Sequence, residues 1–176
     1  DFDGIPAIWL LKKFHPDFKN ARVELVPAGD NTYNNEPVDS NDDVVHVDVG
    51  GGRFDHHHTN DFTCGAKLVY EYLLNEGYIK ADSEALSRMI QVITELDHGW
   101  DSYKWPEPAS DRWEFSLHNV LSGLKMAFAR DNEKYISWVS DSLDGVYLIM
   151  QSKVKAQKEV SKGLKFKTRW GEGVAV

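Results

Sequence analysis

The stretch Asp43-Val-Val-His-Val-Asp-Val-Gly-Gly-Gly-Arg-Phe-Asp-His-His-His58 decides which fold is expected of this chain. Residues 43–49 are nearly continuously apolar, which predicts a strand buried on both faces of a parallel sheet. Three glycines end that strand, and Asp48 lies at its carboxyl end. Open α/β sheets bind their ligands beyond the carboxyl ends of their strands, so this is where a functional site is expected.

The surrounding sequence predicts the other elements. Residues 22–26 alternate between polar and apolar side chains and indicate a second strand. Apolar periodicity predicts five helices, the last of them interrupted near Gly145; they cover 5–14, 65–75, 82–97, 116–130 and 132–162. We therefore expect an α/β fold with a parallel sheet and a mostly helical second half. Residues 1–130 are assigned to a metal-binding catalytic domain, and residues 131–176 to a helical linker and the start of a C-terminal domain.

The composition is that of a soluble globular protein, with 41% hydrophobic and 27% charged residues among 176. No apolar run is long enough to span a membrane, and a single cysteine favours a cytoplasmic location. The net charge of −8 is uneven, because residues 151–176 contribute +5 and leave −13 for residues 1–150. An acidic body argues against a broad nucleic-acid-coating surface, although bound divalent metals would still admit a small phosphorylated substrate. The basic tail is interpreted as a solvated helix face.

Three groups of possible metal ligands precede residue 60, and they are Asp1 with Asp3, Asp48 alone, and the run Asp55-His56-His57-His58. Each has an ordinary alternative: a turn with a helix cap, a strand terminator, or a chance loop sequence. All three lie at the same predicted edge of one sheet, which favours a single site. Carboxylates mixed with imidazoles suit manganese, iron, cobalt or zinc better than calcium.

The order Asp-x-Asp-Gly, strand-Asp and Asp-His-His resembles the DHH phosphoesterase superfamily, whose members include exonucleases, pyrophosphatases and exopolyphosphatases. Residues 47–57 look closest to the melanocyte-proliferating-gene exonuclease branch. The resemblance covers residues 1 to about 100. It implies a two-metal hydrolase, most simply with Mn²⁺, that cleaves phosphodiester bonds of single-stranded RNA, DNA or short oligonucleotides, with no membrane partner. The family has a histidine four residues before the first aspartate, a position that lies before Asp1, and its glycine-rich C-terminal motif is absent.

The resemblance also implies roles for individual residues. Asp48 would bridge both ions, while His57 would face the phosphate as a charge-stabilising or proton-donating group. The remaining metal ligands would be Asp1 for one ion and Asp3, His56 and Asp97 for the other. Asp97 is the later acidic ligand that the family carries on a helix, and His98 beside it is interpreted as a supporting or helix-capping residue.

Other residues near the motif have open interpretations. Arg53 suits a bidentate phosphate contact but equally an ordinary surface position, and His58 is expected to be an exposed loop residue rather than a phosphate contact. The aromatic run 100–105 follows Asp97 and would either stack a nucleobase or pack in the core. The alternatives to a nuclease are a manganese-dependent pyrophosphatase or polyphosphatase, a catalytically inactive metal-binding module and, with weaker support, a metal-dependent hydrolase of non-phosphate substrates. The sequence leaves the oligomeric state open.

Overall fold

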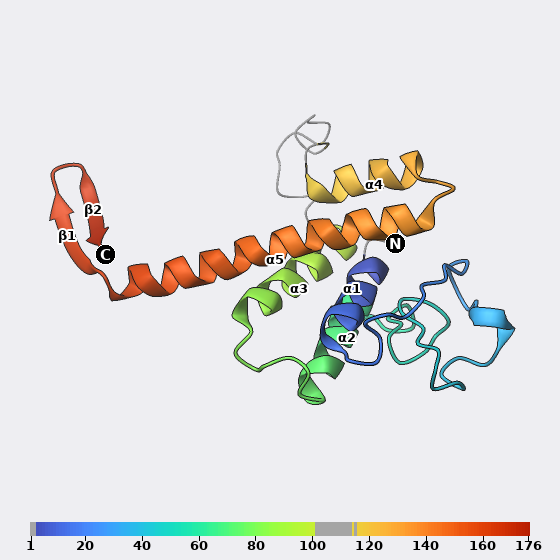
Figure 1. Cartoon of the computed structure of the whole chain (residues 1–176). Helices are drawn as coiled ribbons and strands as arrows, with labels where there is room; N and C mark the ends of the chain where they lie inside the picture. The colour runs from blue at the N-terminus through green and yellow to red at the C-terminus, as the bar shows by residue number, and fades with distance from the viewer. Residues whose placement is uncertain (1–2, 101–113, 115) are drawn as a thin grey trace.

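The computed structural model describes residues 3–100, 114 and 116–176. The helices are α1 (Gly4–Phe14), α2 (Gly65–Asn75), α3 (Glu84–Asp97), α4 (Leu117–Ala127) and α5 (Asn132–Lys162), with a short 3-10 helix at Tyr33–Asn35. Strands β1 (Leu164–Thr168) and β2 (Gly171–Ala175) form an antiparallel hairpin. Helices α1, α2 and α3 gather under the first half of α5, and the hairpin lies at the far end of α5 (Figure 1).

The core forms where the apolar stripes of four helices meet. Helix α3 buries Leu86, Met89, Ile90 and Ile93, which recur every three or four residues and so share one face. Helix α5 contributes residues spaced by four, and α1 and α2 fill the centre; the fully buried members include Leu10, Val69, Leu73, Val139 and Leu143. This packing holds the end of α3 and the starts of α1 and α2 in fixed relative positions, which is what the site requires.

The predicted helices are confirmed, but the predicted interruption of the last one is wrong. Helix α5 runs through Gly145 without a break. A glycine inside a helix costs about 1 kcal/mol relative to alanine. Burial of Val139 and Leu143 against the core offsets that cost. None of the described helices has both the length and the apolar character needed to cross a membrane.

The strands expected at 22–26 and 43–49 are not found. The backbone of both segments has no regular secondary structure. Asp48 adopts a φ of 57°, which is left-handed and incompatible with a strand. Its N–H donates to the carbonyl of Phe54 at 2.9 Å, and Gly50 N–H donates to Gly29 at 3.0 Å. These two N–H groups are therefore not available to pair with a neighbouring strand. The only sheet in the described residues is the β1–β2 hairpin, and the parallel-sheet class stays a prediction.

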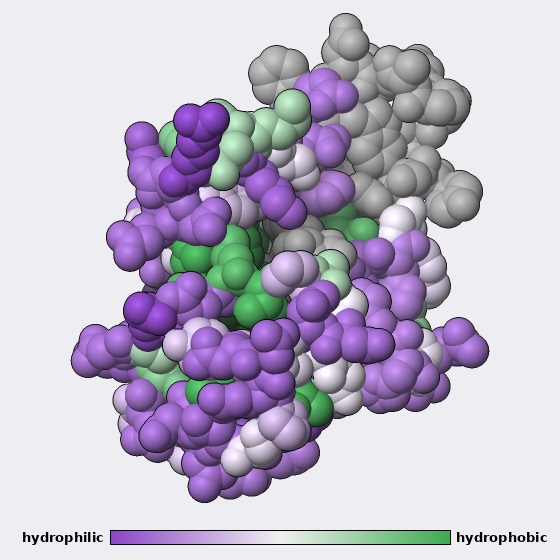
Figure 2. Space-filling view, turned by 90° about the vertical axis from the view of Figure 1, so that its right-hand side faces the viewer, coloured by the Kyte–Doolittle hydropathy of each residue, from purple (hydrophilic) through white to green (hydrophobic). Residues whose placement is uncertain are grey.

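The outer half of α5 and the hairpin extend away from the core. Val154 is the last buried residue of α5, and both strands are exposed apart from Gly173. The first half of α5 packs in the same core as α1 and α3, so it is structurally part of the body. The domain boundary placed at residue 131 stays a prediction. On the side that Figure 2 shows, the surface is mainly hydrophilic, with apolar residues in a central hollow.

Candidate metal centre

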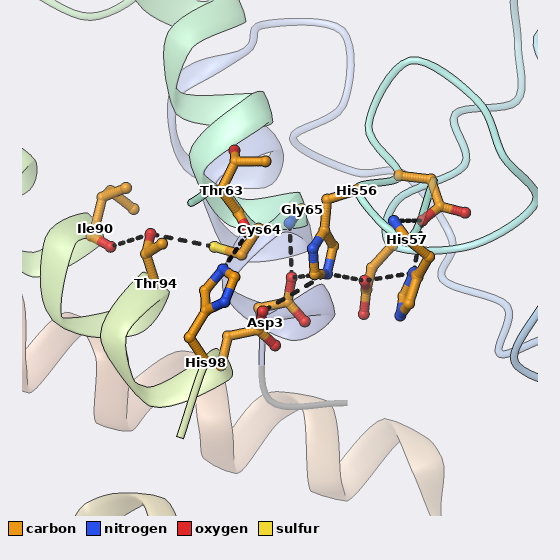
Figure 3. A network of polar contacts seen from close by, with 12 residues as sticks. Asp3, His56, His57, Thr63, Cys64, Gly65, Ile90, Thr94 and His98 are labelled. Atoms are coloured by element: carbon orange, nitrogen blue, oxygen red, sulfur yellow. Dashed lines mark hydrogen bonds and ion pairs between the residues drawn. The ribbon is translucent and has the colours of Figure 1, made fainter. Parts of the chain in front are cut away.

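Three carboxylates converge on one imidazole nitrogen. The Nε2 atom of His56 lies 3.7 Å from Asp3 Oδ2, 3.4 Å from Asp48 Oδ1 and 3.6 Å from Asp97 Oδ2. These side chains come from four places in the sequence: the residue before α1, two points in the 44–58 loop and the last residue of α3. Figure 3 shows Asp3 and His56 pointing toward one another beside the start of α2. The structure thus brings together four of the predicted ligands.

Helix ends hold the carboxylates in place. Asp3 precedes α1, and its Oδ2 accepts a hydrogen bond of 2.7 Å from the N–H of Gly65, the first residue of α2. This bond uses one of the free N–H groups at the start of a helix, where negative charge is also favoured by the helix dipole. Asp97 ends α3, and Gly99, with a φ of 67°, turns the chain just after it.

The local electrostatics favour a cation. Asp3 is fully buried, and in the described part of the chain its Oδ1 and the Oδ1 of Asp48 are buried without a hydrogen-bond donor. Burial, reinforced by the charge of Asp3, raises the pKa of Asp48 to about 8. Burial and then Asp3 also raise the pKa of Asp97, although His56 opposes this. Buried carboxylates without donors are costly unless a positive charge compensates them.

The donor set fits a transition metal. Asp3, His56 and Asp97 form one group of three whose ligand atoms lie within 4.8 Å of one another, and Asp48, His56 and His57 form another. Mixed carboxylate and imidazole donors suit Mn²⁺, Fe²⁺, Co²⁺ or Zn²⁺. Asp48 adjoins both groups, because its Oδ1 is 3.4 Å from His56 Nε2 and 3.7 Å from His57 Nδ1. The residues present therefore fit divalent metal binding, and their individual roles stay predictions.

His57 is held by a separate carboxylate. Its Nδ1 lies 2.6 Å from Oδ1 of Asp55, an atom that also accepts a hydrogen bond from the backbone N–H of His57 at 3.1 Å. The other oxygen, Oδ2, accepts from the backbone N–H of Gly51 at 2.7 Å. Burial tends to raise the pKa of Asp55, but these hydrogen bonds outweigh burial and hold it below its usual range. An ionised Asp55 fixes the proton of His57 on Nδ1, which leaves Nε2 as an acceptor. The side chain of His57 is 58% exposed and so can meet a ligand from solution.

The other candidate residues lie elsewhere or outside the described residues. The guanidinium of Arg53 lies over the rings of Phe54 and Tyr72, at 4.7 and 5.3 Å, rather than against the carboxylates. His58 is exposed, as expected of a loop residue. His98 Nε2 lies 2.9 Å from the carbonyl of Thr63, which gives it a supporting position. Asp1 and the aromatic residues at 101–105 lie outside the described residues.

Sequence reasoning missed Gly65 and the role of Asp55. A Cβ at Gly65 would lie 3.1 Å from Asp48 Cβ and 3.2 Å from both Asp3 Oδ2 and the Phe54 carbonyl. Any other residue at the start of α2 would require the two aspartates to move by a few tenths of an ångström. One available signal was a glycine opening a helix whose preceding residue, Cys64, provides no side-chain cap. Asp55 was visible in the motif, but its contact with His57 required the folded loop.

Gly65→Ala is expected to weaken metal binding by about tenfold while the protein still folds. The added methyl group displaces Asp3 and Asp48 by a few tenths of an ångström, and metal sites are sensitive to such shifts. Isothermal titration with Mn²⁺ measures the change. Gly123→Ala, at an exposed helical position with no atom within 4 Å of the added methyl group, is the control for the substitution itself. An unchanged Mn²⁺ affinity in Gly65→Ala would show that this close approach is not needed.

Comparison with protein-family models, with curated proteins and with solved structures finds no match to this chain. A functional assignment therefore depends on the geometry itself. A buried cluster of carboxylates around one imidazole, with a second imidazole exposed at its edge, is suited to metal-assisted hydrolysis.

Proposed function

We propose that this protein is a metal-dependent phosphoesterase of the DHH type, which hydrolyses phosphodiester bonds of nucleic acid or short oligonucleotides with two divalent ions, Mn²⁺ in the simplest case. The observation that carries the proposal is the convergence of Asp3, Asp48 and Asp97 within 3.7 Å of His56 Nε2. Two carboxylate oxygens of this cluster lack donors in the described residues. The order of these ligands along the sequence matches the DHH pattern.

In this proposal Asp3, His56 and Asp97 would hold one ion, Asp1 would hold a second, and Asp48 would be a ligand shared by both. Bound metals would supply Lewis-acid polarisation of the phosphate and a water of lowered pKa. The protein contributes a fixed arrangement of ligands, because two of them, Asp3 and Asp97, lie at helix ends. Gly65 N–H, for example, fixes Asp3. Such pre-positioned charges need no reorganisation during the reaction.

His57 is proposed to act on the substrate rather than on the metal. Its Nδ1 is engaged by Asp55 and its side chain is exposed, so Nε2 would be the atom available to an incoming phosphate. When protonated, that nitrogen can donate to a phosphate oxygen or to the leaving oxygen. Asp55 orients the ring for this contact through its 2.6 Å interaction with Nδ1. Asp55 thus serves as a positioning residue for His57.

The proposed substrate is a single-stranded RNA, DNA or short oligonucleotide, and the proposed location is the cytoplasm, in agreement with a single buried, unpaired cysteine. A pyrophosphatase or polyphosphatase would use the same ligands and needs no surface for a base. A metal-binding module without activity does not require an exposed imidazole (His57) paired with a buried carboxylate (Asp55). The Asp55–His57 pair therefore favours an enzyme over an inactive module.

Incubation of the full-length protein and Mn²⁺ with a 5-mer RNA and, in parallel, with pyrophosphate tests the proposal. Release of mononucleotides faster than phosphate release from pyrophosphate is the expected result. His58→Ala, which alters an exposed histidine beside the pair, is the matched control and should behave as wild type. Metal binding without hydrolysis of any phosphate substrate would overturn the proposal and favour the inactive module.

His56→Ala and His57→Ala are expected to have opposite effects on metal content and turnover. His56 Nε2 lies among three carboxylates, so its loss should lower bound Mn²⁺. His57 is exposed and held by Asp55, so its loss should lower kcat by about 10²–10⁴-fold, the range of general acid–base catalysis, with metal retained. Elemental analysis combined with kinetics measures both. Equal metal loss in the two variants would refute this division of labour.

A further inference from the structure

Two aromatic rings stack at the surface beside the metal cluster. The rings of Phe62 and Trp100 are parallel to within 21°, with centroids 4.2 Å apart. Phe62 also contacts the ring of His98 at 4.7 Å, and His98 lies 6.4 Å from the ring of His56. A continuous row of rings therefore leads from a proposed metal ligand to Trp100.

This row is not core packing. Trp100 is 52% exposed and Phe62 is 37% exposed, although aromatic side chains of this size normally bury most of their surface. Exposed aromatic rings in contact with one another are a feature of surfaces that bind a ligand or partner.

The row is also held rigidly relative to the metal ligands. Trp100 follows Asp97 by three residues, across the turn at Gly99, and Phe62 follows His56 by six. The His98 ring between them is fixed by its contact with the carbonyl of Thr63 at 2.9 Å, which Figure 3 shows next to the start of α2. A group bound on the rings would therefore keep a constant position relative to the cluster.

We propose that Phe62 and Trp100 form a stacking platform for the nucleobase of the nucleotide whose phosphate lies at the metal cluster. This inference depends on the proposed phosphoesterase function and narrows its substrate to nucleotides rather than inorganic pyrophosphate or polyphosphate. Every nucleobase has a flat π-face, so stacking accepts any base and confers no sequence specificity. Phosphate affinity comes from the metal site, and discrimination between a nucleotide and a bare phosphate comes from the rings.

Two ligands that differ only in the base test the platform: adenosine 5′-monophosphate and ribose 5-phosphate. Both are titrated calorimetrically into the Mn²⁺-loaded protein. The wild type should bind the nucleotide more tightly by roughly 5- to 150-fold, the range that one stacked base provides. Trp100→Ala and Phe62→Ala should each reduce this ratio strongly while leaving the affinity for ribose 5-phosphate unchanged. Trp100→Phe, which keeps a flat ring, should restore most of it.

Trp170→Ala is the matched control, because Trp170 is an exposed tryptophan (81%) on the hairpin, far from the cluster. It should keep the wild-type ratio. Equal affinities for the two ligands in the wild type, or an unchanged ratio in Trp100→Ala, would overturn the platform and leave the phosphoesterase proposal standing. Failure of both ligands to bind would contradict the phosphate site itself, and the platform with it.

Discussion

Replacing Asp48 by asparagine is expected to lower kcat by about a hundredfold or more, because the variant loses the carboxylate proposed to bridge both ions. Lewis-acid stabilisation by the metals contributes several kcal/mol to such reactions, and an amide oxygen without charge is a much weaker ligand. Kinetics on a short RNA and elemental analysis of the purified variant measure the loss of rate and of metal. Retention of more than about a tenth of the wild-type rate would exclude a site bridged by Asp48.

The same variant should remain folded. Asp48 has a φ of 57°, a conformation that asparagine adopts more readily than most residues. The amide also cannot ionise, so it never adds a second negative charge beside Asp3. Circular dichroism and thermal unfolding without metal should therefore show a melting temperature at least equal to that of the wild type. Asp61→Asn, at an exposed position, is the control for the substitution itself.

Affinity for Mn²⁺ should rise about tenfold per pH unit up to about pH 8 and then level off. Asp48 is mostly protonated below that pH, and a metal binds the carboxylate only after its proton has left. Titrations between pH 6 and pH 9 in two buffers of different ionisation enthalpy give the affinity and the number of protons released. In Asp48→Asn the slope should largely disappear. A wild-type affinity independent of pH over this range would contradict a raised pKa at Asp48.

Without metal, the same group makes stability fall with pH. Burial and Asp3 raise the pKa of Asp48 from its ordinary value of 3.8 to about 8 in the folded protein, so the folded state binds the proton more tightly than the unfolded state. That contribution is complete below about pH 4 and is lost progressively as the pH rises to 8. Saturating Mn²⁺ should reverse the loss, because a ligand of the folded state stabilises it. Thermal unfolding at pH 5 and pH 8, with and without Mn²⁺, measures both effects.

The helices could be predicted from the sequence because their stabilisation is encoded at short range. The spacing of Leu86, Ile90 and Ile93 places them on one face of α3 whatever that face contacts. A strand, by contrast, exists only when a neighbour pairs with it. Residues 43–49 have strand-forming composition, yet the N–H groups of Val44 and Asp48 donate within the loop and Asp48 is left-handed. Local composition contains no information about such pairing.

The candidate site was predictable only in part for the same reason. Asp3, Asp48 and His56 stand in a recognisable order, and the resemblance to a family added Asp97 from a distant helix. The contact of Gly65 with Asp3 joins residues 62 positions apart. Phe62 and Trp100 stack only because α3 and the loop before α2 end side by side. Contacts of this kind depend on tertiary packing, which one sequence does not specify by periodicity.

The length of α5 separates the basic and acidic regions of the molecule, which affects its interaction with a charged ligand. Its 31 residues span roughly 46 Å, and the seven Lys and Arg residues of 151–176 lie along its outer half and the hairpin. Charges are screened over about 8 Å at physiological ionic strength, so the basic arm hardly neutralises the acidic body. A charged ligand nearby therefore interacts with a region of charge +5 (residues 151–176) or one of charge −13 (residues 1–150), rather than with a uniform charge of −8. A polyanion would therefore be attracted only within a short distance of the arm, and its approach would be directional and sensitive to salt.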